Sequence, residues 1–208
     1  MDCYALLTKR KELEFILSRV EPHLTPKLSL EQYTTPPRLA ALLLYTAAYT
    51  FNDIVGKRVC DLGCGVGRLA IGAAYLGARE VLAIDLDKQA VYVAKRYAQK
   101  FGLPINWIVG DISIITGTVD TVIQNPPFGV RRRGADTRFL KKAFEIGEIV
   151  YSIHKSGENN RRYLAKVAEV NGRKVQVLFE AQLEIPYQFK FHRKPRYKVK
   201  VDIYRITR

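Results

Sequence analysis

Apolar positions along this chain change between helical and strand-like spacing, and the changes predict the order of its elements. Residues 3–20 favour an amphipathic helix, because apolar side chains recur at helical spacing at Leu6, Leu13, Ile16, Leu17 and Val20. Pro22 and Pro26 predict its end. A polar segment with prolines covers residues 28–37, and residues 38–50 predict a second, buried helix.

The middle of the chain alternates between short apolar runs and helical patterns. The runs predict strands at residues 58–62, 80–84, 106–109 and 119–124. Helical patterns at residues 69–75 and 88–101 separate the first three. Continuous apolar strands that alternate with helices are typical of an α/β fold with a parallel sheet covered on both faces.

The last third of the chain predicts two helices, at residues 139–147 and 161–169, with a short strand at residues 149–152 between them. Residues 174–184 and 198–206 alternate as strands do, and we expect an antiparallel pair at one side of the sheet. No linker or internal repeat divides the chain, so we expect one domain over residues 1–208. Within it, residues 1–37 form an N-terminal helix and a covering segment, and residues 38–208 form the core.

Composition points to a polyanionic partner. The 208 residues carry a formal net charge of +14, which fits nucleic acid. General solubility or a heat-adapted, charge-rich surface would also account for this charge.

The three cysteines, Cys3, Cys60 and Cys64, are too few for a disulfide framework and suit a reducing compartment. Cys60 and Cys64 have no second pair to complete a zinc site, so we expect no metal. No signal peptide is recognisable, and the apolar stretch at residues 39–51 is too short to span a bilayer. We therefore expect a cytoplasmic protein with no membrane association.

A glycine-rich turn follows the first predicted strand and opens a helix. Its glycines are Gly63, Gly65 and Gly67, which allow a sharp bend and close approach of a ligand. A dinucleotide-binding fingerprint would place its third glycine where this chain has Arg68, which weakens the case for a nicotinamide dehydrogenase. Asp61 lies just before the turn, where a carboxylate can meet an amino-bearing ligand.

Two further acids end the next two strands. Asp85, next to Leu86, can accept hydrogen bonds from both hydroxyls of a ribose. Asp111, next to Ile112, lies where an adenine amino group can be recognised. Each acid alone is more often a helix cap or a solvated loop residue. Together with Asp61 they predict a ligand with an amino acid end, a ribose and an adenine, which is S-adenosylmethionine.

An Asn-Pro-Pro-Phe turn, formed by Asn125, Pro126, Pro127 and Phe128, follows the fourth strand. A rigid loop is the simplest explanation of paired prolines. Beside the predicted cofactor, however, the Asn125 side-chain oxygen and the Pro126 carbonyl can accept the two N–H groups of an exocyclic amine. Phe128 can stack on a flat base. The turn therefore predicts methyl transfer to an exocyclic amino group, with Asn125 also beside the cofactor.

These two motifs resemble the class I amino-methyltransferases, a family of adenine-N6 enzymes and of enzymes that methylate protein glutamine. The resemblance covers about residues 28–155. Residues 30–36 and 150–155 are similar to the small archaeal and eukaryotic family that methylates an adenine of small-subunit ribosomal RNA. The resemblance implies a Rossmann-like fold with a mostly parallel seven-stranded sheet. It also implies that Gln32, Tyr33 and Thr34 close over the cofactor, and that eukaryotic members work with a small zinc-binding activator protein.

Basic residues follow the Asn-Pro-Pro-Phe turn and recur near the end of the chain. Arg131, Arg132 and Arg133 come first, with Lys141 soon after, and they predict a clamp on substrate phosphates. Arg193, Lys194 and Arg196 alternate with aromatic residues that can stack on unpaired bases. A solvated loop and a hairpin with core aromatics are the plain alternatives.

The sequence as a whole favours an N6-adenine methyltransferase that acts on RNA, with the target adenine flipped out or already unpaired. Two alternatives stay open. One is methylation of protein glutamine or of another amine, and the other is a non-catalytic RNA-binding subunit that has kept the cofactor fold.

Overall fold

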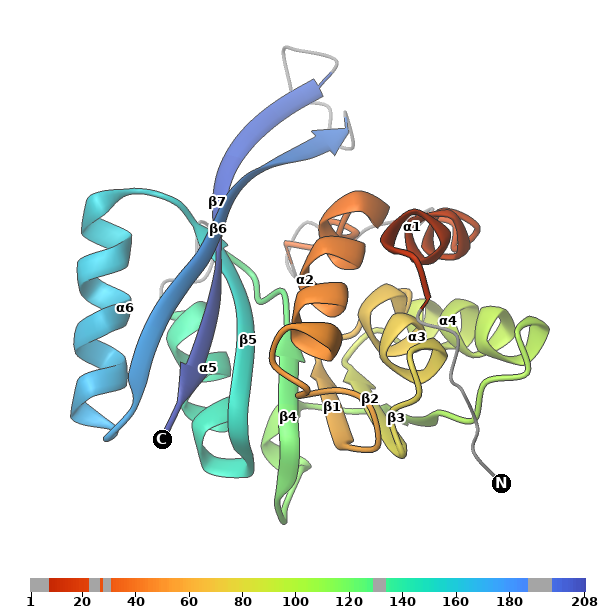
Figure 1. The fold of residues 1–208 in the computed structure, drawn as a ribbon, viewed down its shortest axis with the longest axis horizontal. Helices are drawn as coiled ribbons and strands as arrows, with labels where there is room; N and C mark the ends of the chain where they lie inside the picture. The colour runs from red at the N-terminus through yellow and green to blue at the C-terminus, as the bar shows by residue number, and fades with distance from the viewer. Residues whose placement is uncertain (1–7, 23–26, 28–30, 129–133, 187–195) are drawn as a thin grey trace.

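Seven strands form one mixed sheet in the order β3-β2-β1-β4-β5-β7-β6 (Figure 1). The structure is a computed structural model that describes residues 8–22, 27, 31–128, 134–186 and 196–208. The strands are β1 (Arg58–Leu62), β2 (Glu80–Asp85), β3 (Asn106–Val109), β4 (Val119–Gln124), β5 (Gly147–Lys155), β6 (Lys174–Pro186) and β7 (Arg196–Thr207). The helices are α1 (Arg10–Ser18), α2 (Pro37–Tyr49), α3 (Arg68–Tyr75), α4 (Lys88–Lys100), α5 (Ala135–Ile146) and α6 (Glu158–Val170), with a 3-10 turn at Ile112–Ile114.

The strand pairing confirms the predicted Rossmann-like α/β fold. Strands β1 to β5 run parallel to one another, and β7 pairs antiparallel with both β5 and β6. The chain proceeds outward from β1 through β2 to β3 and then returns to place β4 on the other side of β1. In such sheets ligands bind at the carboxyl ends of the strands, where the order reverses. That point lies between β1 and β4.

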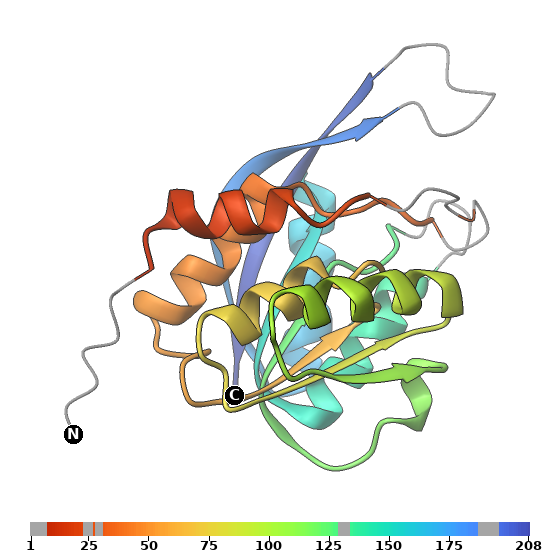
Figure 2. The same cartoon turned by 90° about the vertical axis from the view of Figure 1, so that its right-hand side faces the viewer.

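Helices cover both faces of the sheet and create two apolar cores (Figures 1 and 2). On one face, α2, α3 and α4 contribute Leu44, Ile71 and Val91, and α1 packs on α2 and α3. On the other face, α5 and α6 contribute Leu140 and Leu164. The continuous apolar runs of the central strands follow from this double coverage, because alternate side chains enter different cores.

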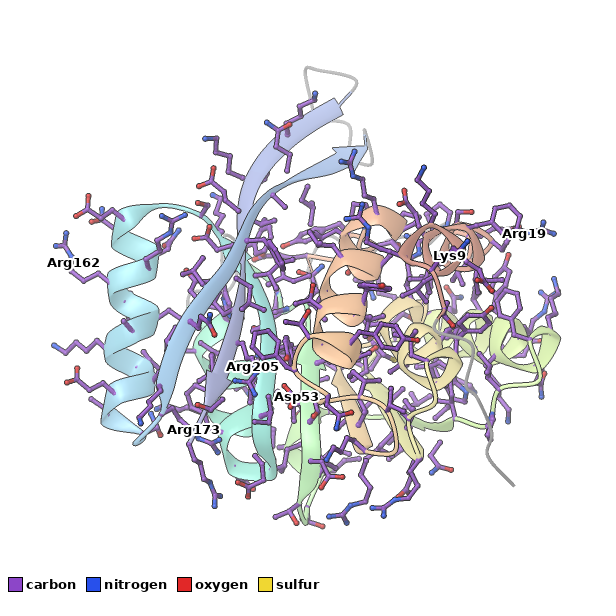
Figure 3. The ribbon with its side chains drawn as sticks, viewed as in Figure 1. Lys9, Arg19, Asp53, Arg162, Arg173 and Arg205 are labelled. Atoms are coloured by element: carbon purple, nitrogen blue, oxygen red, sulfur yellow. The ribbon has the colours of Figure 1, made fainter. Side chains whose placement is uncertain are left out.

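An ion pair joins the loop before β1 to strands β5 and β7. Asp53, in the loop before β1, accepts hydrogen bonds from the Tyr151 hydroxyl at 2.6 Å and from Arg205 Nε at 2.9 Å (Figure 3). The Arg205 guanidinium also lies 4.4 Å from the centre of the Phe51 ring. These contacts tie the α2–β1 connection to β5 and β7.

The first helix is shorter than the sequence predicts. Residues 3–20 were expected to be helical, but α1 covers only Arg10–Ser18, and Leu6 lies outside the described residues. The helix ends early because the Arg68 side chain takes up carbonyl oxygens of Leu17 and Val20. Satisfied carbonyls at its C-terminal end allow the chain to leave the helix at this point.

Two boundaries around the fifth strand also differ from expectation. Helix α5 begins at Ala135 rather than at residue 139, because Gly134 adopts a left-handed conformation (φ 81°) and its carbonyl starts the helix. Strand β5 covers Gly147–Lys155 rather than residues 149–152, since β4 and β7 pair with it on both sides. Local apolar spacing does not reveal such partners.

The predicted antiparallel pair is confirmed, and it is longer than expected. Strands β6 and β7 pair from Lys174 opposite Thr207 to Pro186 opposite Arg196. Their far ends rise above the rest of the sheet in Figure 1. In the part of the chain that the structure describes, no helix is long and apolar enough to cross a membrane.

Candidate active site

A cavity of about 340 Å³ opens at the carboxyl ends of β1, β2 and β4. This size is within the range of small-molecule sites. The structure brings eleven of the predicted cofactor residues into its wall: Gln32, Tyr33, Thr34, Asp61, Gly63, Gly65, Asp85, Leu86, Asp111, Ile112 and Asn125. The position agrees with the strand-order reversal, where an open α/β sheet binds its ligand.

The glycine-rich turn forms part of the cavity wall, where a ligand can lie close to the backbone. The N–H groups of Gly63 and Cys64 both donate to the Ile84 carbonyl at 2.9 Å, which holds the turn across β2. Gly65 has a φ of 53°, and a Cβ built there would meet no atom within 4 Å. That open space is part of the cavity.

Gly67 has a different role from the one expected. It does not line the cavity, and a Cβ at this position would lie 2.5 Å from the Trp107 ring and 2.8 Å from the Ala94 Cβ. Its φ of 79° starts α3. The glycine is therefore needed for close packing of α3 against β3 and α4, and it supports the cofactor turn from behind.

Asp61 presents an unsatisfied acceptor to the cavity. The side chain is buried, and Oδ2 accepts a hydrogen bond from the Ala70 N–H at 2.9 Å. Its Oδ1 is buried and has no hydrogen-bond partner among the described residues. Burial raises the pKa of the Asp61 carboxyl to about 8, with a smaller effect from Asp85. A buried acceptor without a partner is costly, and a ligand ammonium group would satisfy it.

Asp85 is fixed by backbone donors on both of its oxygens. Oδ2 accepts from the Gly65 N–H and Oδ1 accepts from the Asp87 N–H, each at 2.8 Å. A carboxylate offers about four lone-pair sites and accepts hydrogen bonds from hydroxyls, which suits a ribose. The carboxylate thus links the glycine-rich turn to the start of α4 and remains in the cavity wall.

A prediction follows from this geometry. Asp85→Ala is expected to weaken S-adenosylmethionine binding by about 10-fold or more, because it removes both the ribose acceptor and the bond that fixes the turn. Calorimetric titration of the cofactor measures the effect, and Asp120→Asn provides a control carboxyl at the other end of β4. An unchanged affinity would remove Asp85 from the ribose site.

Gln32 links the covering segment, which contains Gln32, Tyr33 and Thr34, to Asp87 at the start of α4. Its Nε2 donates to Asp87 Oδ2 at 3.0 Å, and its Oε1 accepts from the Lys27 N–H at 2.7 Å. The Lys27 ammonium also donates to Asp87 Oδ1 at 3.0 Å. Both ends of the Gln32 amide are therefore used to hold the segment over the cavity, while the side chain still lines it.

Asp111 forms an ion pair in the cavity wall. Its Oδ1 accepts from the Ser113 N–H at 2.9 Å and from the Arg138 guanidinium. The bonds from Ser113 and Arg138 lower the pKa of the Asp111 carboxyl to about 2. The contact places Arg138 within the cavity wall beside Asp111.

Asn125 carries a second unsatisfied acceptor. Its Nδ2 donates to Thr35 Oγ1 at 3.0 Å, while its Oδ1 is buried and without a hydrogen-bond partner in the described part of the chain. Asn125 and Pro127 line the cavity, whereas Pro126 is buried behind the wall. A buried amide oxygen without a partner among the described residues, on a residue that lines the cavity, fits an N–H donor.

Phe128 lies outside the cavity wall and contacts Tyr33. The two ring centres are 4.9 Å apart, and the rings are tilted by 42°. The Tyr33 hydroxyl is buried with no hydrogen-bond partner among described residues, and its burial raises the pKa of this phenol. The covering segment and the Asn-Pro-Pro-Phe turn therefore meet directly.

The cavity wall also contains residues that were not selected from the sequence, among them Thr35, Cys64, Arg68 and Phe139. Phe139 packs under the glycine-rich turn, where a Cβ on Gly63 would lie 2.8 Å from its ring. Arg68 could have drawn attention as the residue that replaces a dinucleotide-binding glycine. Thr35 has no local signal, because its contact with Asn125 spans 90 residues.

Most of the predicted RNA-binding residues lie outside the part of the chain that the structure describes. Arg131, Arg132, Arg133, Arg193 and Lys194 lie outside the described residues, and so does the side chain of Arg196, the first residue of β7.

Lys141 lines a second, polar cavity with Arg173 and Arg208. Arg173, labelled in Figure 3, donates to the Gly147 carbonyl at the amino end of β5. Helix α5 runs back from the active site, so its first turn carries Arg138 into the cofactor cavity while Lys141 faces the other end of the sheet.

The described residues contain no group of three or more His, Cys, Asp or Glu side chains that could hold a metal ion. Cys60 and Cys64 are buried thiols, and burial raises the pKa of Cys60 to about 12. The unsatisfied groups of the cavity are the oxygens of Asp61, Asn125 and Tyr33. These oxygens can accept hydrogen bonds from an organic ligand and a substrate that carry N–H or O–H groups.

Comparisons with known proteins agree with this geometry. Residues 40–148 match the family model of the methyltransferase small domain. A relative from Danio rerio, named rRNA N(6)-adenosine-methyltransferase METTL5, is 39% identical over 206 residues, which cover 96% of this chain and 99% of the relative. A Drosophila melanogaster relative with the same name is 36% identical, over 95% of each chain.

A solved structure extends the match to the whole fold. The crystal structure of a Pyrococcus horikoshii protein, named as a candidate RNA methyltransferase, superposes with a TM-score of 0.90. It is 44% identical and covers 97% of this chain and 98% of its own. The chain therefore belongs to the methyltransferase small domain family, and it is a class I methyltransferase whose cofactor is S-adenosylmethionine.

Proposed function

We propose that this enzyme transfers a methyl group from S-adenosylmethionine to the N6 atom of an adenosine in ribosomal RNA. The observation that carries the proposal is the Asn125 Oδ1 atom, a buried acceptor without a partner among the described residues, in the wall of the cofactor cavity. Relatives named as rRNA N6-adenosine methyltransferases match nearly the whole chain, which supports an adenosine target. The resemblance of residues 30–36 and 150–155 favours small-subunit RNA.

Bound S-adenosylmethionine supplies a methyl group on a sulfonium that is already activated. The cavity residues hold its parts: Asp61 Oδ1 accepts from the amino group, Asp85 accepts from the ribose, and Asp111 with Ile112 and Leu86 surrounds the adenine. Gly63 and Gly65 allow the backbone to approach closely. Tyr33 and Thr34 cover the cavity, and Gln32 holds that cover in place through Asp87.

The target amine is a weak nucleophile, because its lone pair is delocalised into the base. Asn125 Oδ1 accepts one of its N–H groups and draws the nitrogen toward a tetrahedral geometry. The Pro126 carbonyl, which the sequence predicts as the second acceptor, belongs to a buried residue outside the cavity wall. Pro126 and Pro127 keep the turn rigid. As the nitrogen bonds to the methyl carbon, the methyl–sulfur bond would break and its electron pair would stay on sulfur, so that the cofactor would leave as a neutral thioether. The methylated nitrogen would become more acidic, and its proton would leave to water. No strong general base is needed, since positioning supplies much of the rate.

RNA binding rests on charge that is largely outside the described residues. We propose that Arg131, Arg132 and Arg133 hold substrate phosphates, and that Arg193, Lys194 and Arg196 provide a second contact. Lys141 is left out of this surface, because it faces the other end of the sheet. The net charge of +14 agrees with a polyanionic substrate.

Replacing Arg131, Arg132 and Arg133 together by Ala is expected to reduce the salt dependence of RNA affinity. Each lost phosphate contact lowers the slope of log K against log salt by about 0.7 to 0.9. Filter binding at several salt concentrations measures the slope. Lys141→Ala is the matched control, with an expected slope equal to wild type. An unaltered slope in the triple variant would show that the run does not contact RNA.

A small zinc-binding activator protein is a candidate partner, and the cytoplasm is the proposed location. The first comes from the resemblance to eukaryotic ribosomal RNA methyltransferases, and the second from the sparse cysteines. Co-purification from cell extract followed by zinc analysis of the bound proteins tests the partner.

Transfer of labelled methyl groups to separate acceptors tests the substrate class. Purified ribosomal RNA is expected to accept label, while ribosomal proteins are not. Label in protein alone would favour glutamine methylation and overturn the RNA proposal. Cofactor binding without transfer to any acceptor would favour a non-catalytic RNA-binding subunit.

A further inference from the structure

Three segments that are distant in sequence meet behind the Asn125 side chain. Asn125 follows β4, Thr35 lies in the covering segment before α2, and Arg68 begins α3. Thr35 is 7% exposed and Arg68 is 6% exposed, so both lie in the interior. Their polar groups are nevertheless used in defined hydrogen bonds, which makes the arrangement specific rather than a matter of apolar packing.

The first contact fixes the orientation of the Asn125 amide. Nδ2 donates to Thr35 Oγ1 at 3.0 Å, and Oδ1 is left buried and unbonded by the described residues. A half-turn of the amide about its last side-chain bond would exchange the two atoms. Only the oxygen can accept from a target amine, and an NH₂ group in its place would repel the substrate. In the observed orientation Thr35 Oγ1 holds the amide through its nitrogen, which leaves the oxygen for the substrate.

The second contact fixes Thr35 itself. The Arg68 Nη1 donates to the Thr35 carbonyl at 2.6 Å, and its Nε donates to the Leu17 carbonyl at 3.1 Å. Its Nη2 donates to the Val20 carbonyl. One guanidinium thus joins the end of α1, the covering segment and the start of α3. Only a planar group with several fixed donors can satisfy carbonyls from three directions.

The position of Arg68 connects this network to the cofactor. It is the first residue of α3 and directly follows Gly67, the last glycine of the cofactor turn. Pro36 and Pro37 follow Thr35 and restrict the backbone on its other side. Thr35 is therefore held between a rigid proline segment and the helix that carries the cofactor turn.

We propose that Thr35 is a positioning residue for methyl transfer, which orients the Asn125 amide, and that Arg68 keeps Thr35 in place. The role rests on the proposed function of Asn125 as acceptor of the target amine. It makes the N-terminal segment part of the catalytic centre and not only a cover for the cofactor.

Thr35→Val tests this directly, since valine has the shape of threonine but cannot accept a hydrogen bond. We expect kcat to fall about 10-fold or more, while the cofactor dissociation constant and the melting temperature stay near wild type. Thr35→Ser keeps the hydroxyl and is expected to retain most of kcat. Wild-type kcat in Thr35→Val, or equal losses in the two variants, would overturn the proposal.

Coupling between the two residues separates positioning from general damage. If Thr35 acts only through Asn125, then Thr35→Val should cause no further loss of kcat in an Asn125→Ala background. Multiplicative losses in the double variant would show that Thr35 acts elsewhere.

A readout that needs no substrate distinguishes failure of this proposal from failure of the proposed function. The side-chain NH₂ signals of Asn125, assigned in ¹H–¹⁵N NMR spectra by their absence in Asn125→Ala, should shift in Thr35→Val but not in Thr35→Ser. Arg68→Lys keeps the charge but not the fork of donors, and it should shift the same signals. If the wild type methylates no RNA, the proposed function fails, while unshifted Asn125 signals in Thr35→Val would overturn the positioning role.

Discussion

Asn125→Ala is expected to lower kcat by about 10²–10³-fold and to leave cofactor affinity within about twofold of wild type. The substitution removes a buried side-chain oxygen that has no hydrogen-bond partner among the described residues, on a residue of the cavity wall. That acceptor strengthens its bonds as the nitrogen becomes positively charged, so it stabilises the transition state more than the bound substrate. Single-turnover transfer to RNA measures the chemical step, and calorimetry measures cofactor binding.

Asn106→Ala is the matched control for this result. Asn106 is an exposed asparagine on β3 whose amide donates to Glu80, away from the cavity. Its replacement should leave kcat unchanged. A kcat near wild type in Asn125→Ala would contradict the role of the amide oxygen, and an equal loss of cofactor affinity would place Asn125 in cofactor binding instead.

Asp61→Asn is expected to weaken S-adenosylmethionine binding by about 10- to 100-fold, because a hydrogen bond to a charged group is lost from a buried site. The pH dependence gives a second signature. Burial raises the pKa of Asp61 to about 8 in the free protein, so below that pH the carboxyl is protonated. A cofactor ammonium can then bind only if the proton is expelled.

Wild-type affinity should therefore fall as the pH decreases below about 8, by at most about tenfold per pH unit, since one proton is released on binding. Calorimetric titration between pH 6 and pH 8 measures this slope. Asp61→Asn should lack it, whereas the control Asp120→Asn, at the other end of β4, should keep it. A wild-type affinity that is flat over this range would contradict the contact between Asp61 and the amino group.

The strands and the acids at their ends could be predicted from the sequence because both depend on local pattern. A buried parallel strand is a continuous apolar run, and its carboxyl end is known once the run is known. Asp61, Asp85 and Asp111 follow three such runs, so their common cavity was predictable before any contact was seen. The glycine spacing added the turn between β1 and α3.

What the sequence could not predict depends on contacts between distant segments. The early end of α1 is caused by Arg68, which lies about fifty residues further along the chain. Lys141 was expected near the substrate, but α5 carries it to the opposite end of the sheet. The local sequence of a helix does not show how many of its turns lie beside a site. The contact between Thr35 and Asn125 depends on the positions of α2 and the four strands that separate the two residues along the chain.

Nucleoside analysis of labelled RNA tests the central claim most directly. Wild-type enzyme is incubated with tritiated S-adenosylmethionine and purified ribosomal RNA, and the RNA is digested to nucleosides and separated. We expect the label to elute with N6-methyladenosine, and we expect Asn125→Ala to yield almost no labelled N6-methyladenosine. Label in any other nucleoside, or in N6-methyladenosine at the same rate in Asn125→Ala, would contradict it.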